Sequence, residues 1–80
     1  ISDGKYTFKQ DYEAEGTNVV GAGMGIANFM LKYLFKRGER FAGTKISETE
    51  VEIETDGGTK YDGGIYNGRC VFVVPTSVLE

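Results

Sequence analysis

The chain has 80 residues, a net charge of −3, no histidine and a single cysteine, Cys70, and its length predicts one domain over residues 1–80 with a single core. These counts exclude an intramolecular disulfide, Cys/His zinc sites and most histidine-based catalysis, and the acidic balance argues against a nucleic-acid partner. We therefore expect a non-enzymatic protein without metal or cofactor; no signal-peptide pattern fixes its compartment, and a cytoplasmic location is slightly favoured.

The first expected element is a strand from Lys5 to Ala14. Apolar and polar residues alternate over this segment, which is the period of a half-buried strand. Gln10 interrupts the apolar face, so the pattern favours an edge strand or a local twist over a central strand. The apolar face carries Tyr6, Phe8, Tyr12 and Ala14.

A helix is expected next, with its regular part beginning near Met24 and ending at Gly38. Asn18 offers a side-chain oxygen that can accept from the first unpaired N–H groups of a helix. Lys36 and Arg37 match the negative end of the helix dipole, and Gly38 favours a left-handed stop. One helical face carries Ala22, Ile26, Phe29, Met30, Tyr33 and Leu34.

Two further strands are expected in the second half of the chain. From Ile46 to Thr55 every other residue from Glu48 onward is a glutamate, which indicates a strand with one solvated face. The segment from Arg69 to Val74 is β-branched and aromatic, so it is expected to be the best-buried strand. Three dipeptides between these strands favour tight turns and predict one or two hairpins, with a short extra strand at 60–66. They are Asp56-Gly57, Asp62-Gly63 and Asn67-Gly68.

These elements predict an α+β fold in which one helix packs on an antiparallel sheet of three or four strands, in the order strand, helix, strand, strand. The helix would be apolar around more of its surface than one sheet face covers, unless a strongly twisted sheet wraps it. At about 18 Å its apolar stretch is too short to span a bilayer of roughly 30 Å. A homo-oligomer is the expected cover for its second apolar stripe, ahead of a hydrophobic ligand or a membrane surface. That stripe is Met24, Ala27, Leu31 and Phe35.

The alternative function is the binding of a small molecule or an anion. The glycines at 21, 23 and 25 look superficially like the turn of dinucleotide-binding domains, but the third glycine falls one residue early and the chain is too short for that sheet. The backbone N–H groups of Gly21, Gly23 and Gly25 remain a candidate anion site at a helix start. A pocket between helix and sheet would be lined by Tyr6, Tyr12, Phe29 and Tyr33.

Two other features have a structural explanation that we prefer. The repeated Asp-Gly-Gly at 56–58 and 62–64 could suggest calcium ligands, but turn formation explains both copies. Cys70 lies in the most apolar segment and is expected to be a core residue, because Arg69 would point to the opposite face of the strand and could not activate the thiol. The leading hypothesis is a non-enzymatic binding or structural module that self-associates through its helix or strand edges.

Overall fold

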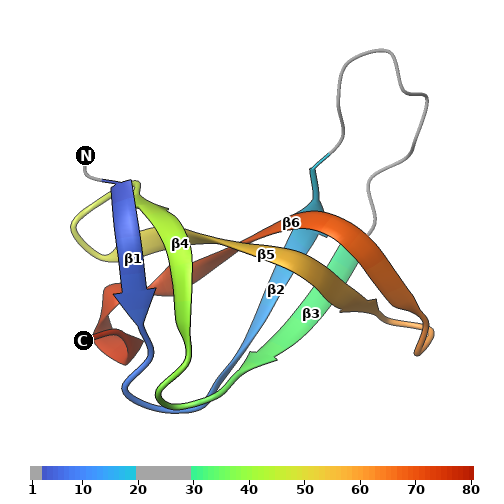
Figure 1. The fold of residues 1–80 in the computed structure, drawn as a ribbon, viewed down its shortest axis with the longest axis horizontal. Coiled ribbons are helices and arrows are strands. Elements are labelled where there is room, and N and C mark those ends of the chain that lie inside the picture. Colours follow the sequence, from blue (N-terminus) through green and yellow to red (C-terminus); the bar gives the residue numbers. More distant parts are fainter. Residues whose placement is uncertain (1–2, 20–29) are drawn as a thin grey trace.

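The computed structural model describes residues 3–19 and 30–80, and within them it is almost entirely β-sheet (Figure 1). The only helical element in the described residues is one 3-10 turn, η1 at Thr76–Val78. The expected α+β fold with a helix packed on a sheet is therefore wrong. The strands are β1 Asp3–Thr7, β2 Tyr12–Asn18, β3 Met30–Phe35, β4 Arg40–Lys45, β5 Glu50–Lys60 and β6 Ile65–Pro75.

The strands form one antiparallel sheet in the order β1-β4-β5-β3-β2-β6, and it closes because β6 also pairs with β5. β5 pairs with β6 along most of its length, with β4 through Val51–Ile53, and with β3 through Thr59 and Lys60. Since β2 joins β3 to β6, these four strands make a closed ring, and the fold is a small barrel. Figure 1 shows β1 with β4 and β2 with β3 as two arms, with β5 and β6 crossing both.

The segment that was expected to form the second half of the helix is the strand β3. Leu31 and Phe35 are fully buried, whereas Met30 and Leu34 are 56% and 46% exposed, and this alternation is the period of a strand. The predicted stop at Gly38, which has a φ of 90°, is the turn from β3 to β4 and not the end of a helix. The first half of the expected helix lies outside the described residues.

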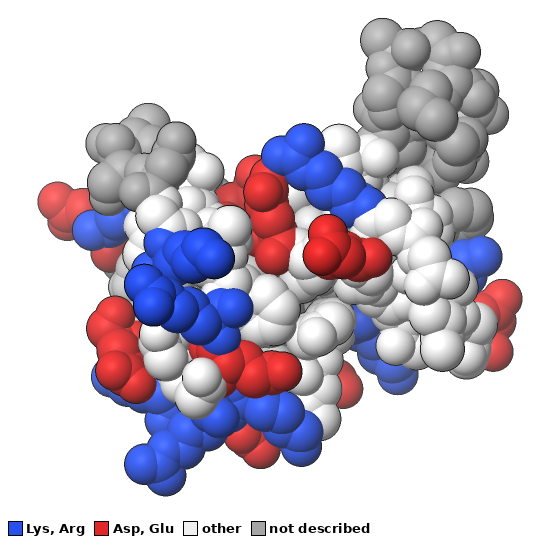
Figure 2. Space-filling view, viewed as in Figure 1, with Lys and Arg blue, Asp and Glu red and all other residues white. Residues whose placement is uncertain are grey.

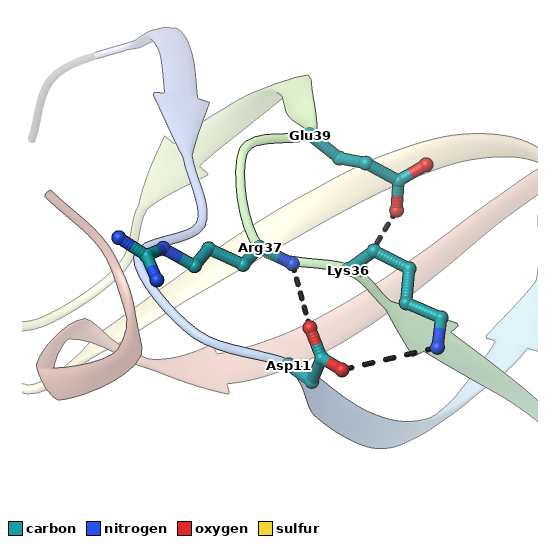
Figure 3. Close-up of polar contacts among 4 residues, drawn as sticks. All are labelled: Asp11, Lys36, Arg37 and Glu39. Carbon is teal, nitrogen blue, oxygen red and sulfur yellow. Dashed lines mark hydrogen bonds and ion pairs between the residues drawn. The ribbon is translucent and has the colours of Figure 1, made fainter.

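The expected strand from Lys5 to Ala14 is divided into β1 and β2. β1 is the first strand in the sheet order, whereas β2 lies between β3 and β6, so the expected edge position holds only for the first part of this segment. The connection between β1 and β2 is tied to the turn between β3 and β4 (Figure 3). The Asp11 carboxylate accepts a hydrogen bond from the Arg37 N–H at 2.8 Å and lies 3.8 Å from the Lys36 ammonium.

The second half of the chain forms the hairpin β5–β6, as expected. Val51 and Ile53 point inward between the outward glutamates, and Cys70 and Phe72 in β6 are likewise fully buried, so β6 is not better buried than β5, contrary to expectation. Of the three turn dipeptides only Asp62-Gly63 forms the hairpin turn. Asp56-Gly57 instead lies at an irregularity in the β5–β6 register, which bends the hairpin across the barrel.

The core is built on aromatic rings. Phe8 and Phe35 stack with their centroids 4.4 Å apart, and Phe72 meets Phe35 edge-on at 5.7 Å. Aromatic pairs in such geometries stabilise a core beyond the area that they bury. The fully or nearly buried apolar residues are Phe8, Ala14, Leu31, Phe35, Val51, Ile53, Cys70, Phe72, Val74, Val78 and Leu79.

Candidate binding slot between β4 and β5

β4 and β5 pair over only part of their length. The ladder runs from Lys45 opposite Val51 to Gly43 opposite Ile53 and ends there. Within the described residues, Arg40–Ala42 pair only with β1 on their other edge, and β5 beyond Ile53 pairs only with β6 until Thr59 reaches β3. The two strands therefore diverge and leave a gap of about 320 Å³. We call this gap the β4–β5 slot; its lining is Arg40, Phe41, Ala42, Glu54, Thr55, Asp56 and Arg69.

The lining shows that the slot lies between strand edges. Arg40–Ala42 and Glu54–Asp56 are consecutive runs on their strands, so each run contributes both outward and inward positions. A hollow on one face of a sheet would be lined by alternate residues only, because successive side chains point to opposite faces. Main-chain N–H and C=O groups of both strands therefore border the slot.

Phe41 gives the slot an aromatic floor. Its side chain is half-buried, points inward, and packs edge-on against Phe35 at 5.1 Å and Tyr33 at 5.8 Å. Thr55, on the opposite wall, is buried, and its hydroxyl donates to the Gly57 carbonyl at 2.7 Å. The inner part of the slot is therefore bordered by an aromatic ring that belongs to the core packing and by a hydrogen-bonded hydroxyl.

The outer rim of the slot is charged. Arg69 donates to the Glu54 carboxylate, and this bond raises the pKa of the guanidinium. In the described part of the chain neither Arg40 nor Asp56 forms a side-chain hydrogen bond or an ion pair. Figure 2 shows basic and acidic side chains next to one another where β5 and β6 cross, with uncharged surface below them.

A second depression continues the slot across the outer surface of β4. It has a volume of about 480 Å³ and shares Ala42, Glu54 and Arg69 with the slot. Lys5 on β1 lies at its far side, directly opposite Ala42 in the β1–β4 register. Because Ala42 is exposed and small, the two depressions join over its side chain. A ligand longer than the slot can therefore extend towards β1.

The residues that the sequence predicted for a ligand site or an interface differ in where they lie relative to the slot. Tyr6, Tyr12 and Tyr33 are half-buried and pack against the core, and none of them lines the slot. Burial and the nearby Glu39 carboxylate raise the pKa of Tyr33. Other predicted site residues lie outside the described residues, namely Gly21, Gly23, Met24, Gly25, Ala27 and Phe29.

Leu31 and Phe35, two residues of the predicted oligomer interface, are fully buried in the barrel. Their side chains are covered by the chain itself, so the surplus apolar helix face that motivated the prediction does not exist at these positions. Sequence reasoning missed the slot because no residue type marks the point where one strand leaves another. In the sequence, Arg69 marked only the start of an expected strand.

The reactive groups of the chain are not gathered at the slot. Cys70 is fully buried, and its burial raises the pKa of the thiol, whose Sγ lies 3.4 Å from the Gly68 carbonyl oxygen. Residues 3–19 and 30–80 contain no group of three Cys, Asp or Glu placed to hold a metal ion. Nor do they contain a helix with the length and apolar character that crossing a bilayer requires.

Comparisons with protein-family models, with curated proteins and with solved structures found no match. The function is therefore inferred from the slot alone.

Proposed function

We propose that this chain is a non-enzymatic binding module and that its ligand occupies the β4–β5 slot. The observation that carries the proposal is the divergence of two strands beyond Gly43 and Ile53, which leaves main-chain polar groups beside an aromatic floor. Ligand sites combine an apolar surface with a few placed polar groups, and their volumes begin at about 300 Å³. The slot, at about 320 Å³, has both properties on a small scale.

The groups around the slot support binding more than catalysis. Glu54 is engaged by Arg69 and Asp56 is exposed to solvent, so neither carboxylate lies in the apolar environment that one member of a catalytic pair requires. The thiol of Cys70 is fully buried behind Thr55 and does not itself line the slot. A nucleophilic cysteine requires exposure and a positive neighbour that lowers its pKa.

The test is a fragment screen by amide-detected NMR on the wild-type chain and two variants. Ala42→Tyr fills the junction of the two depressions from an exposed position, so it should block the slot without disturbing the core. Leu34→Tyr places the same side chain at an exposed position of β3 and is the matched control. We expect shift changes at Arg40–Ala42 and Glu54–Asp56 in the wild type and in Leu34→Tyr only. Hits that map elsewhere on a folded wild-type chain would contradict the proposal.

Self-association is a second candidate, and of the helix and the strand edges first considered for it, a strand edge supports it. β1 is the terminal strand of the sheet, and near its end the described residues add only the bridge from Phe8 to Leu79, in which the Glu80 N–H donates to the Thr7 carbonyl. An edge strand is a template for pairing with a second copy. Light scattering across a concentration series should then give a stable multiple of 8.8 kDa, whereas a persistent monomer would remove this candidate and leave the slot unaffected.

A further inference from the structure

We infer that the β4–β5 slot binds an extended peptide segment that adds as a strand beside Arg40–Ala42 and points an acidic side chain at Arg40. The inference rests on the proposed function and names its ligand class. Such strand addition obtains affinity from main-chain hydrogen bonds and specificity from alternate side chains.

The main chain of β4 offers one open edge at the slot. Arg40, Phe41 and Ala42 pair with Thr7, Tyr6 and Lys5 of β1, so one edge of this part of β4 is occupied. Within the described residues their other edge has no strand partner, because the ladder with β5 ends at Gly43. Main-chain polar groups require hydrogen-bond partners, and an extended peptide supplies them in the register of the existing sheet.

The slot also fits the length of a short strand. Three residues of β4 border it, and the second depression extends the available surface past Ala42 towards Lys5. A strand rises about 3.4 Å per residue, so a pentapeptide of about 17 Å is long enough to fill the slot and reach the second depression.

The charges around the two depressions favour an acidic ligand. Their lining contains three cationic side chains, of Lys5, Arg40 and Arg69, and two anionic ones, of Glu54 and Asp56. The lining is thus positive by one charge, and the nearby Glu52 carboxylate acts on Arg69. Arg69 is already bonded to Glu54, which leaves the guanidinium of Arg40 to meet a carboxylate. Guanidinium and carboxylate groups form paired, charge-assisted hydrogen bonds.

The alternation along β4 specifies the order of side chains in the peptide. Arg40 and Ala42 point outward and Phe41 points inward. Because cross-strand neighbours lie on the same face, the peptide should place an acidic residue opposite Arg40, an apolar residue over Phe41 and a small polar residue beside Ala42. The palindromic probe Ac-Thr-Val-Glu-Val-Thr-NH₂ satisfies this order in either chain direction.

The experiment titrates this probe into ¹⁵N-labelled protein at low salt, beside three controls. One control replaces Glu by Gln, and the other two carry N-methyl groups on the Glu amide or on both Val amides. The protein variants are Arg40→Gln and the matched control Arg37→Gln, since Arg37 is exposed in the β3–β4 turn, where its main-chain N–H bonds to Asp11.

We expect the Glu probe to bind about three- to fivefold more tightly than the Gln probe, the range of a partly exposed ion pair. This preference should disappear in Arg40→Gln and persist in Arg37→Gln, and at least one N-methylated probe should lose binding. Equal binding of the Glu and Gln probes, or full binding by both N-methylated probes, would overturn the inference. If fragments perturb the slot and no peptide does, the proposed function stands and only the strand-addition inference fails; if neither perturbs it, both fail.

Discussion

The closed and the split sides of the barrel differ in how closely their strands approach one another. On the closed side β2 packs against β6, and a Cβ at Gly16 would overlap the Val71 carbonyl oxygen and lie 2.5 Å from the Phe72 ring. On the split side β4 leaves β5 beyond Gly43, and the inward ring of Phe41 borders the gap between them. Backbone contact thus closes the sheet where glycine permits it, while the other side retains open strand edges.

The largest expected effect is at Gly16 on the closed side. Gly16→Val introduces a side chain into the contact between β2 and β6, where neither the Val71 backbone nor the buried Phe72 ring has room to move. We expect the variant to show no cooperative unfolding transition in urea. Gly4→Val is the matched control, because a Cβ at Gly4 would meet nothing within 4 Å. A cooperative transition for Gly16→Val at the wild-type midpoint would contradict the close packing of the closed side.

The second-largest effect is expected when one phenylalanine ring is removed from each side of the barrel, and the losses of stability should differ between the two sides. Phe35 is fully buried and contacts four other rings, so Phe35→Ala should reduce the free energy of unfolding by about 3–5 kcal/mol. Phe41 is only half-buried on the floor of the slot, so it removes less apolar surface from water. We therefore expect Phe41→Ala to reduce the free energy of unfolding by about 1–2 kcal/mol. Urea denaturation measures both values, and equal losses would show that the slot is as well packed as the core.

As the pH rises into the alkaline range, the packed core should lose stability at a lower pH than the charged rim of the β4–β5 slot. The pKa of Cys70 and that of Tyr33 are both raised by burial, from ordinary values of 9.0 and 10.0. A raised pKa means that the folded state holds its proton more tightly, so stability is complete below pH 9 and declines as the pH rises through the folded values. Urea midpoints between pH 8 and pH 11 should fall for the wild type and less steeply for Cys70→Ala with Tyr33→Phe. A midpoint that stays constant over this range would contradict the burial of both groups.

The smallest effect is expected at the contacts that hold the β3–β4 turn. Asp11→Ala removes the acceptor of the Arg37 N–H, and should cost about 0.5–1 kcal/mol. Lys36→Gln removes only the exposed ion pair with Asp11, whose side chains are more than half exposed, so it should change the free energy of unfolding by less than about 0.3 kcal/mol. If the two variants lose equal stability, the ion pair and not the turn hydrogen bond connects these loops.

Much of the strand content could be predicted from the sequence. The sequence alone could not exclude a helix. The glutamate alternation located β5, and the β-branched run before Pro75 located β6. The segment Met30–Phe35 is apolar on both faces of a strand, because outward Met30 and Leu34 alternate with buried Leu31 and Phe35. A short run that is apolar at nearly every position matches helical and strand periods equally well, and only the pairing with β2 decides between them.

The slot lay further beyond sequence reasoning, because it depends on where two strands stop pairing. Gly43 is required in the ladder, since a Cβ there would lie 2.8 Å from the Glu52 carbonyl oxygen. The contact between distant segments that makes Gly43 necessary is set by tertiary structure, as is the divergence that follows it. Local propensity carries no information about either feature.

Cross-strand nuclear Overhauser effects between β4 and β5 test the split of the barrel most directly. The structure predicts backbone contacts between Thr44 and Glu52 and between Gly43 and Ile53, and none between Phe41 and Thr55. In the presence of the Glu probe, Phe41 should instead show contacts to the peptide. A continuous series of β4–β5 contacts that runs through Phe41 and Thr55 would close the slot and contradict the account of its function.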